Sequence, residues 1–339
     1  MTAHSATPIH GDRLPRVLVL GGGPDAERDV SLNSARAIAD ALVAAGHTVE
    51  RRTIERIAAA DLARMPGDVI FPALHGGWGE GGPLQDILES DGRPFVGCDS
   101  LPARRAMDKV ATKAVALSLS IPTPATAILD WRDGVCPMEL PVVVKPVHEG
   151  STIGLYLCRT PEDWTAARAS IADEAAQGEL RTYMIEPMIG AGPAGGGKGR
   201  ELTVGLLDGR ALPIIEIVPA EGLYDYEAKY TRDDTTYLLN PELPAGVADR
   251  VKEQTARIAK ALGVRHIARA DFMLDSSGTA WFLEINTMPG FTDHSLVPKA
   301  ARSMGLEMPE LCSTLIRLAL RDHSRPSMNE PAAHAGAAA

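Results

Sequence analysis

The stretch Ile267-Ala-Arg-Ala-Asp-Phe-Met-Leu-Asp-Ser-Ser-Gly-Thr-Ala-Trp-Phe-Leu-Glu-Ile-Asn286 contains two mostly apolar runs on either side of Asp275-Ser-Ser-Gly278. The four central residues are typical of a tight turn, because Asp and Ser side chains bind their own backbone and Gly accepts a positive φ. The pattern therefore predicts a β-hairpin with strands over 267–274 and 279–286.

The predicted register of this hairpin separates polar from apolar side chains. With an even-length loop, Leu274 pairs with Thr279, and Arg269 then lies opposite Glu284. A slip of one residue would mix the two faces. The polar face is expected to hold Arg269, Asp271, Glu284 and Asn286. The apolar face is expected to hold Ala270, Phe272, Leu274, Trp281, Leu283 and Ile285.

The polar face suits a hard metal ion. Asp271, Glu284 and Asn286 offer oxygen atoms without His or Cys, and such donors favour Mg²⁺. The alternative is a solvated surface with a cross-strand ion pair between Arg269 and Glu284. The hairpin by itself does not choose between the two interpretations.

The composition excludes several classes of protein. A formal charge of −10 over 339 residues argues against general nucleic-acid binding, which depends on Lys and Arg that neutralise phosphates. Aromatic residues make up only 4% of the chain, too few for a base-stacking surface. We see no signal peptide and no run of about 18 apolar residues, so we expect a cytoplasmic protein that does not contact a membrane. The scattered Cys98, Cys136, Cys158 and Cys312 are typical of reduced thiols.

The first hundred residues alternate short apolar strands with helical stretches, which is typical of an α/β fold with a mostly parallel sheet. Strands are expected at 17–20, 48–52 and 69–74, and helices at 31–45 and 84–90. After residue 107 the pattern changes.

In the second part, a helix is expected from Lys109 to about residue 120, followed by a buried strand over 141–146. Strands over 183–186 and 201–207 flank the glycine-rich loop 190–199. We divide the chain into a flexible leader, an N-terminal domain, a central subdomain, a C-terminal catalytic subdomain and a disordered tail, with the bounds 1–14, 15–107, 108–190, 191–323 and 324–339.

A glycine pattern follows the first strand. Gly21-x-Gly23-x-x-Ala26 matches the weak dinucleotide-binding fingerprint, with Glu50 in the place of the acid that binds ribose. The hypothesis of an NAD-type oxidoreductase depends on this pattern. A plain tight turn is an equal alternative, because residues 25–29 carry more charge than a helix start that receives pyrophosphate.

Two further segments resemble ligand-binding loops. His75-Gly-Gly-Trp-Gly-Glu80-Gly-Gly-Pro83 follows a strand end, where open α/β sheets bind ligands, and is too glycine-rich for regular structure. Lys145 ends a buried strand before a glycine-serine loop, which suits phosphate binding by backbone N–H groups and the ammonium. The plain alternatives are a structural His75, a Lys145 that reaches the surface, and a solvated Lys109.

Taken in order, these segments resemble D-alanine–D-alanine ligases of the ATP-grasp superfamily, over a match from about Val17 to Leu320. The segments that carry it are Gly22-Gly-Pro-Asp-Ala-Glu-Arg-Asp-Val-Ser31, His75-Gly-x-x-Gly-Glu80, Ala106-Met-Asp-Lys109, Val144-Lys-Pro146, Glu149-Gly-Ser-Thr-x-Gly154, Tyr226-Glu-Ala-Lys-Tyr230, Arg269-x-Asp-Phe272, Glu284-Ile-Asn-Thr-x-Pro-Gly290 and His294-Ser-Leu296. The resemblance implies an ATP-grasp fold, α/β with α+β C-terminal parts, behind a Rossmann-like N-terminal domain.

The resemblance also implies ATP-dependent ligation of two D-alanines through an acyl phosphate, for peptidoglycan precursor synthesis. Glu186 would meet the adenine amino group and Glu201 the ribose. Two Mg²⁺ ions, for which Mn²⁺ can substitute, would be held by Asp271, Glu284 and Asn286. The family suggests a homodimer. The residues implied for ATP binding are Lys109, Lys145, Glu186, Ile189, Glu201 and Lys229.

The remaining implied roles concern the amino acids. The substrate-binding residues would be Glu27, His75, Ser295 and Leu296, with Glu27 at the ammonium of the first D-alanine and Ser295 and Leu296 at the carboxylate of the second. Arg269 and the N–H of Gly290 would stabilise charge at the reacting carbonyl. A hydrogen-bond chain of Glu27, Ser151 and Tyr230 would close residues 222–240 over the site and shield the acyl phosphate from water.

The chain departs from the family pattern at three places. It has Gly81-Gly82-Pro83 where Asp-Gly-Thr is usual, Pro187 where lysine is common, and a longer glycine-rich loop at 190–199. These departures leave ATP affinity and the second substrate open, so D-serine, D-lactate or another amino acid stays an alternative. A degenerate nucleotide-binding module without catalysis is a further alternative, as is the NAD-type oxidoreductase.

Overall fold

The computed structural model describes residues 13–178, 180–191, 199–219, 235–292 and 294–324. Two expected site residues, Lys229 and Tyr230, lie outside these ranges, as do most of the expected leader and tail. Within the described part of the chain, no helix is both long and apolar enough to span a membrane.

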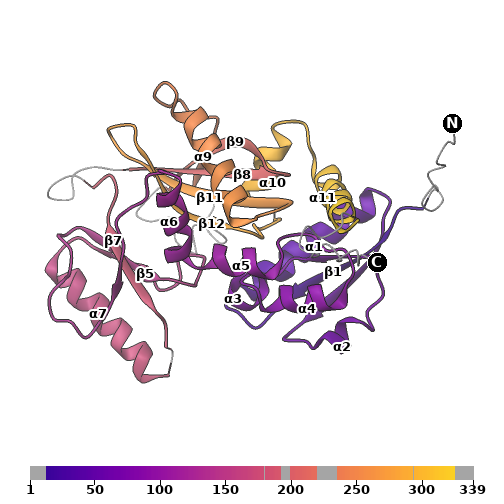
Figure 1. Ribbon diagram of the computed structural model, residues 1–339, viewed down its shortest axis with the longest axis horizontal. Coiled ribbons are helices and arrows are strands. Elements are labelled where there is room, and N and C mark those ends of the chain that lie inside the picture. Colours follow the sequence, from indigo (N-terminus) through magenta and orange to yellow (C-terminus); the bar gives the residue numbers. More distant parts are fainter. Residues whose placement is uncertain (1–12, 179, 192–198, 220–234, 293, 325–339) are drawn as a thin grey trace, which may run out of the picture.

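Three sheets and their helices make up the described structure (Figure 1). The strands are β1 Arg16–Gly22, β2 Thr48–Ile54, β3 Val69–Pro72, β4 Ala127–Leu129, β5 Val142–Pro146, β6 Tyr156–Cys158, β7 Tyr183–Pro187, β8 Arg200–Leu207, β9 Arg210–Val218, β10 Thr236–Leu239, β11 Ile267–Leu274 and β12 Ala280–Asn286. The helices are α1 Arg28–Ala44, α2 Ala59–Leu62, α3 Gly76–Gly79, α4 Pro83–Asp91, α5 Ser100–Met107, α6 Lys109–Ser118, α7 Pro161–Ala176, α9 Val247–Leu262, α10 Leu296–Arg302 and α11 Met308–His323.

The N-terminal sheet is parallel with the strand order β2-β1-β3, which confirms the predicted α/β pattern. From Val17 to Leu20 strand β1 is apolar, because both of its faces are covered there. Val17 and Val19 belong to the core formed with α1 and α11, whereas Leu18 and Leu20 belong to the core formed with α4.

The segment after β3 is partly helical, contrary to the prediction of irregular structure. Gly76–Gly79 forms the single turn α3. Gly76 has a φ of +80°, and a Cβ on Gly79 would lie 2.7 Å from the Cβ of Leu74. Glycines therefore allow this turn because they let the backbone pack closely, and they do not prevent helix formation here.

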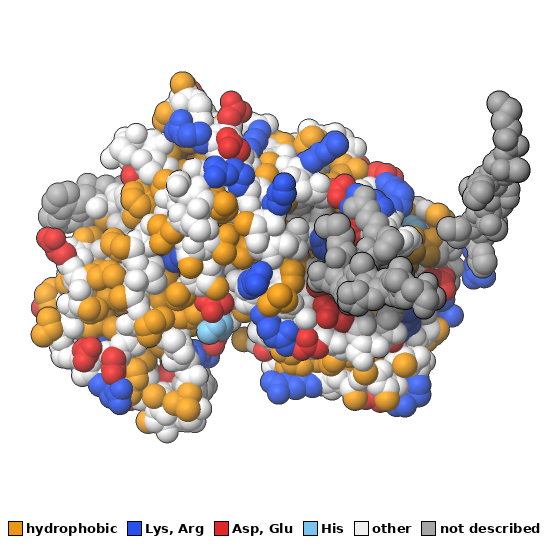
Figure 2. Space-filling view, in the orientation of Figure 1, with side chains coloured by type: hydrophobic (Ala, Val, Ile, Leu, Met, Phe, Trp, Pro, Cys, Tyr) orange, Lys and Arg blue, Asp and Glu red, His pale blue; other side chains and the backbone are white. Residues whose placement is uncertain are grey.

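The central lobe contains the antiparallel sheet β4-β7-β5-β6 with α7 packed on it. Val142, Val144 and Ile185 from the strands share a core with Trp164 and Ile171 of α7. In Figure 2, the lower edge of the molecule is notched between this lobe and the N-terminal domain.

The C-terminal sheet is antiparallel with the order β10-β9-β8-β11-β12. Helices α6 and α9 pack on one side of it and α10 on the other, and α11 packs along α1 of the N-terminal domain (Figure 1). The last helix therefore packs against both the N-terminal domain and the elements of the C-terminal sheet, in one shared hydrophobic core. This packing fixes the position of the N-terminal domain relative to the C-terminal sheet.

The register of the hairpin formed by β11 and β12 differs from the predicted one. Asp275 donates its N–H to the carbonyl oxygen of Thr279 at 3.0 Å, so the loop has three residues and Leu274 pairs with Ala280. Gly278 has a φ of +81°, the left-handed conformation typical of such a loop. The predicted pairing of Leu274 with Thr279 is wrong by one residue.

A β-bulge after Asp271 shifts the register a second time and makes Leu283 the extra residue. Asp271 therefore faces Glu284, and Arg269 faces Asn286 instead of Glu284. The two shifts of one residue each add up to two residues, which is one full period of side-chain alternation in a strand. The predicted polar face therefore keeps all four of its members.

The bulge does change the apolar face. Phe282 is fully buried and packs edge-on against Phe272, with the ring centroids 5.7 Å apart. Trp281 and Leu283 were expected in the core but are only half-buried. The prediction fails for these two residues because strict alternation assumes a regular strand, and a bulge interrupts the alternation.

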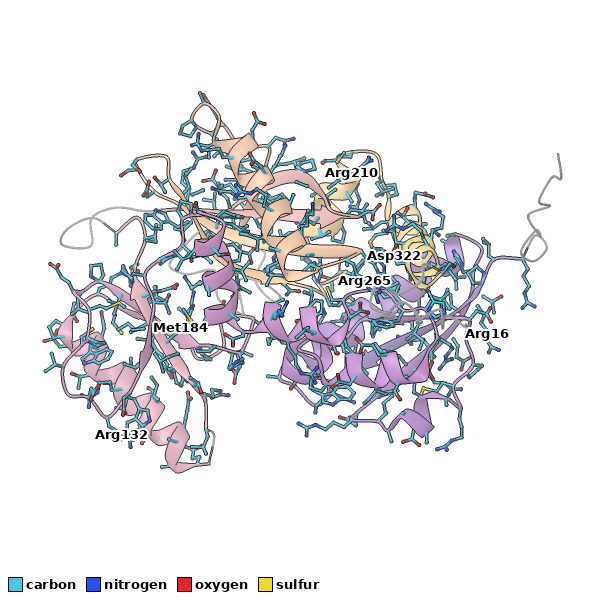
Figure 3. The ribbon with its side chains drawn as sticks, viewed as in Figure 1. Arg16, Arg132, Met184, Arg210, Arg265 and Asp322 are labelled. Atoms are coloured by element: carbon cyan, nitrogen blue, oxygen red, sulfur yellow. The ribbon has the colours of Figure 1, made fainter. Side chains whose placement is uncertain are left out.

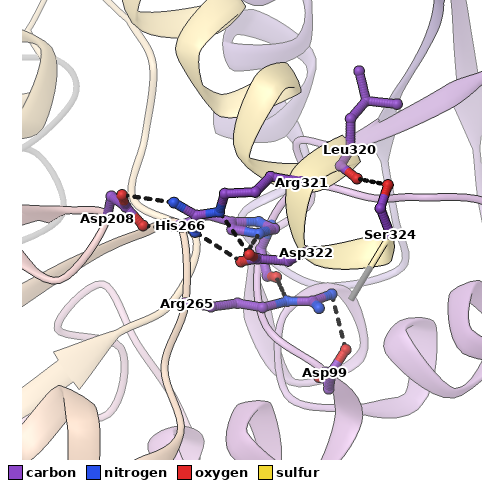
Figure 4. Close-up of polar contacts among 9 residues, drawn as sticks. Asp99, Asp208, Arg265, His266, Leu320, Arg321, Asp322 and Ser324 are labelled. Atoms are coloured by element: carbon purple, nitrogen blue, oxygen red, sulfur yellow. Dashed lines mark hydrogen bonds and ion pairs between the residues drawn. The ribbon is translucent and has the colours of Figure 1, made fainter. Parts of the chain in front are cut away.

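A polar cluster joins the N-terminal domain to the C-terminal sheet and to α11 (Figure 4). The Nδ1 of His266 accepts the N–H of Gly97 at 3.0 Å, and its Nε2 donates to Asp322 at 3.2 Å. Arg265 donates to the carbonyl oxygen of Gly97 at 2.7 Å and pairs with Asp99 at 2.8 Å. Figure 3 shows Arg265 and Asp322 beside each other at this junction.

This cluster predicts that the protein loses stability in mild acid. Burial, aided by the charge of Arg265 and opposed by Asp322, lowers the pKa of His266 to about 4. The unfolded chain therefore takes up a proton below about pH 6.5 that the folded protein does not, so stability falls as the pH falls from there towards 4. The loss from this residue is expected to reach at most about 3 kcal/mol.

Thermal unfolding at pH 7.5 and pH 5 measures this effect. His266→Asn is the variant to compare, because Asn tolerates the left-handed φ of +63° at this position and does not titrate. The variant is expected to be less stable at pH 7.5 and to lose less on acidification. An equal loss in the wild type and the variant would assign the acid sensitivity to other groups.

Candidate active site

A cavity of about 440 Å³ lies between the central sheet and the C-terminal sheet. It has the size of a small-molecule site. The cavity is lined by all five described residues that are expected to bind ATP. It is also lined by both carboxylates that are expected to bind the metal ion. Together these residues are Lys109, Lys145, Glu186, Ile189, Glu201, Asp271 and Glu284.

The two lysines of the cavity are buried, so the solvated and surface interpretations are wrong. Lys109 is 6% exposed and Lys145 is 7% exposed. Lys109 opens α6, whose start is capped by Asp108, and its ammonium donates to the carbonyl oxygen of Glu149 and lies 3.4 Å from Glu284. Burial lowers the pKa of Lys109, while Glu284 opposes that shift. Two cations in one cavity suit a polyanionic ligand.

Glu186 is 3% exposed on β7 and meets two ammonium groups. Its Oε1 lies 2.5 Å from the Nζ of Lys145, and its Oε2 lies 2.8 Å from the Nζ of Lys113. Lys113 was not predicted from the sequence. Its position four residues after Lys109 places both lysines on one side of α6, and this spacing could have revealed it.

The polar face of the hairpin forms one wall of the cavity. Arg269 donates from Nε and Nη2 to Asp271, at 3.0 to 3.2 Å, and Thr203 donates to the same carboxylate at 2.6 Å. Among the described residues, no three His, Cys, Asp or Glu side chains come together as a metal site. Two carboxylates of the kind in Asp271 and Glu284, completed by phosphate oxygens and water, nevertheless fit what Mg²⁺ prefers.

Asn286 belongs to the same face but not to the described lining of the cavity. Its side-chain oxygen accepts the N–H of Met288 at 2.9 Å. It thus shapes the turn that follows β12, and a second lone pair of this oxygen stays available to a cation.

A second cavity, of about 450 Å³, adjoins the first and opens toward the N-terminal domain. The two share four lining residues, which are Pro146, Glu149, Gly150 and Ile153. Glu27 lies in the wall of the second cavity and accepts a hydrogen bond from Ser151. The loop that carries Ser151 therefore separates two spaces, one beside the lysines and one beside Glu27.

This loop has an unusual backbone. Ser151 and Thr152 have φ values of +52° and +64°, in the left-handed region that non-glycine residues rarely adopt. Such conformations cost on the order of 1 kcal/mol each and concentrate at functional sites. The hydrogen bond from Ser151 to Glu27 is one of the contacts that hold the loop.

His75 and Glu80 fix the turn after β12 from the N-terminal domain. Glu80 accepts the N–H of Met288 at 3.1 Å, and the Nδ1 of His75 donates to the carbonyl oxygen of Met288 at 3.0 Å. Burial lowers the pKa of His75 and, together with the charge of Glu27, raises the pKa of Glu80 well above its ordinary value. His75 and Glu80 both position this turn. The expected contact of His75 with substrate stays a prediction, and the role of Glu80 was not predicted from the sequence.

The turn continues to the residues expected at the second substrate. Ser34 accepts the N–H of Phe291 at 3.1 Å, and the Oγ of Ser295 accepts the N–H of Thr292 at 2.9 Å. A Cβ on Gly290 would lie 2.8 Å from the Oγ of Ser295, so a larger residue there would displace the Ser295 hydroxyl. Leu296 begins α10 directly after Ser295.

The structure argues against a dinucleotide site at the first glycine loop. Glu50 pairs with Arg16 at 3.1 Å and Arg52 at 2.7 Å, and Figure 3 shows Arg16 at the far end of the domain from the central lobe. At the start of α1 the carboxylate of Glu27, held by Ser151, occupies the region where a pyrophosphate would need positive charge.

Known proteins are similar to this chain in sequence and in fold. The family described as "D-ala D-ala ligase C-terminus" matches residues 131–317. A D-alanine–D-alanine ligase of Desulforudis audaxviator is 41% identical over 313 residues, which cover 90% of this chain and 98% of that protein. Another from Ectopseudomonas mendocina is 41% identical over 320 residues, which cover 93% and 97%. The crystal structure of D-alanine–D-alanine ligase from Bacillus anthracis complexed with ATP is 29% identical and superimposes with a TM-score of 0.74 over 92% of this chain and 99% of that one.

Proposed function

The chain belongs to the D-alanine–D-alanine ligase family, and we propose that the cavity between its central and C-terminal sheets binds the ATP that drives its reaction. The protein has the ATP-grasp fold and joins two D-alanines into D-alanyl-D-alanine, a peptidoglycan precursor. The observation that carries the proposal for the site is the common lining of one cavity by two lysines, Glu186, Glu201 and the two hairpin carboxylates.

ATP would lie along the cavity with its phosphates at the lysines. Lys109 and Lys145 supply the positive charge, and the loop after Lys145 supplies N–H groups. Glu186 and Ile189 lie at the end of the cavity formed by β7 and the residues after it, where we place the adenine, and Glu201 on β8 would accept the ribose hydroxyls. Pro187 lines the same end, and its effect on ATP affinity stays a prediction.

Asp271 and Glu284 would hold Mg²⁺ together with Asn286. Bound there, Mg²⁺ supplies neutralising charge to the phosphate oxygens during phosphoryl transfer. The protein contributes a rigid face for this purpose, since Asp271 is fixed by Arg269 and Thr203.

The first D-alanine would occupy the second cavity, with its ammonium at Glu27. An oxygen of its carboxylate attacks the γ-phosphorus of ATP, the bond to ADP breaks, and an acyl phosphate forms. The amine of the second D-alanine then attacks the carbonyl carbon, and inorganic phosphate leaves as the peptide bond forms.

Arg269 and the N–H of Gly290 would stabilise the oxyanion that develops on that carbon. Among the described residues, the N–H of Gly290 donates to no other group, which leaves it available. Ser295 and the N–H of Leu296 would receive the carboxylate of the second substrate. Lys229 at the γ-phosphate and Tyr230 in the closing loop stay predictions, because both lie outside the described residues.

Phosphate release tests this function directly. We expect phosphate to appear when the protein is given ATP, Mg²⁺ and D-alanine, and no comparable release when D-alanine is omitted. Mass analysis of the products from mixed D-alanine, D-serine and D-lactate identifies the second substrate. Activity with a different amino-acid pair but none with D-alanine would contradict the substrate assignment.

We also propose that the protein is located in the cytoplasm and forms a homodimer. All four cysteines are free thiols, of which three are buried, in agreement with a reducing compartment. The dimer rests on the family alone, and light scattering of the purified protein measures it.

A further inference from the structure

Lys113 is a buried lysine without a role in the scheme above. Its side chain is 4% exposed, and its ammonium lies 2.8 Å from the Oε2 of Glu186. It also lies 3.0 Å from the hydroxyl of Thr123 and 3.4 Å from the carbonyl oxygen of Pro124. Burying a charged ammonium costs free energy unless such partners surround it.

The position of Lys113 relative to the cavity distinguishes it from Lys145. Lys145 and Glu186 line the cavity, whereas Lys113 does not belong to its described lining. Lys113 therefore contacts the Glu186 carboxylate from the side that faces away from the cavity. Each carboxylate oxygen accepts about two hydrogen bonds, so both oxygens keep a lone pair for a donor inside the cavity.

We propose that Lys113 is a positioning residue that keeps Glu186 ionised and directed at the 6-amino group of adenine, and thereby selects ATP over nucleotides with a 6-oxopurine base. The inference rests on the proposed binding of ATP in this cavity. Lys145 cannot do this alone, because incoming phosphates attract its ammonium away from Glu186. Lys113 is out of their reach and stays with the carboxylate.

Thr123 anchors Lys113 to the C-terminal sheet. The hydroxyl of Thr123 donates to the carbonyl oxygen of Phe282 at 2.8 Å, and the N–H of Phe282 donates to the carbonyl oxygen of Pro122 at 2.8 Å. These bonds cover the outer edge of β12, the strand that carries Glu284. Lys113 thus sits at a fixed point between the two sheets that enclose the nucleotide.

The charge of Lys113 determines which base fits. Burial by itself would raise the pKa of Glu186, but Lys145 and Lys113 together hold it below its ordinary value. An ionised carboxylate only accepts hydrogen bonds, which matches the amino group of adenine and repels a 6-oxo group. Without Lys113, a protonated Glu186 could donate to a 6-oxo oxygen, and the discrimination would weaken.

The test compares ATP with inosine triphosphate, which carries a 6-oxo group and no 2-amino group. In Lys113→Met we expect KM for ATP to rise. We also expect the ratio of kcat/KM for ATP to kcat/KM for inosine triphosphate to fall by about 10- to 100-fold, because a hydrogen bond to a charged group contributes about this much. Lys113→Arg keeps the charge and is expected to keep the ratio within about threefold. Lys260→Met, at an exposed position on α9, is the matched control.

Each outcome is informative. If Lys113→Met does not fold, Lys113→Gln keeps a hydrogen-bond donor without the charge, and the same fall in the ratio is expected. A folded neutral variant with an unchanged ratio overturns the inference, even if its activity is lower, since a merely structural role would affect both nucleotides equally. A wild-type protein without ATP-dependent activity would instead contradict the proposed function, so the two failures are distinct.

Discussion

Glu284→Gln is expected to lower kcat about a thousandfold, which corresponds to roughly 4 kcal/mol of lost transition-state stabilisation. The substitution keeps the size of the side chain and removes its charge. Glu284 lies opposite Asp271 in the strand pairing and 3.4 Å from the ammonium of Lys109. The neutral amide would weaken the hold on Mg²⁺ and leave Lys109 without its carboxylate partner at the phosphates.

Steady-state kinetics with increasing Mg²⁺ measure this loss. Part of the activity is expected to return at high Mg²⁺, because binding and not folding is impaired. Glu253→Gln is the matched control, since Glu253 is 68% exposed on α9 and pairs only loosely with Arg257, at 3.7 Å. Unchanged kcat in a folded Glu284→Gln protein would remove Glu284 from the metal site.

Arg269→Met is expected to lower kcat by about 100- to 1000-fold with a smaller change in KM, because one donor to the developing oxyanion is lost. The variant also leaves the Asp271 carboxylate without the guanidinium that holds it through Nε and Nη2. Thr203 would be its remaining hydrogen-bond donor among the contacts described above. The two effects act on different steps: the weakened hold on Asp271 affects the phosphoryl transfer that forms the acyl phosphate, and the lost donor affects the attack of the amine on it.

Arg269→Lys separates these effects. Lysine keeps the charge but lacks the planar fork that binds a carboxylate and a carbonyl oxygen together, so partial activity is expected. Arg210→Met, on the exposed start of β9, controls for the loss of a surface arginine (Figure 3). A KM effect with an unchanged kcat would place Arg269 in substrate binding instead of transition-state stabilisation.

Much of the fold followed from local sequence patterns. The apolar run at Val17 predicted β1, and Gly46 after the first helical stretch predicted the end of α1, which stops at Ala44. These predictions succeed because hydrophobic periodicity and glycine act within a few residues of themselves. The bulge in β12 has no such local mark, so the half-buried positions of Trp281 and Leu283 could not be foreseen.

The sequence allowed predictions about the site where residue type alone limits the chemistry. Oxygen donors on one strand face indicated Mg²⁺, and a lysine at the end of a buried strand indicated phosphate. Lys113 escaped prediction because a lysine on a helix is usually solvated. Its spacing from Lys109 was the one local signal, and its burial follows from the packing of α6 on β12 and the contact with Glu186 of β7. Glu80 escaped because its partner, Met288, is 208 residues away in the chain.

The sequence by itself indicated the family, several of the strands and helices, and the polar face of Arg269, Asp271, Glu284 and Asn286. Its two register errors cancelled in parity, which is why that face was correct although the pairing was wrong. Only the tertiary structure decided which side chains share a cavity and which carboxylates are buried beside which cations. Burial and charge pairing depend on segments far apart in the chain, and local periodicity carries no information about them.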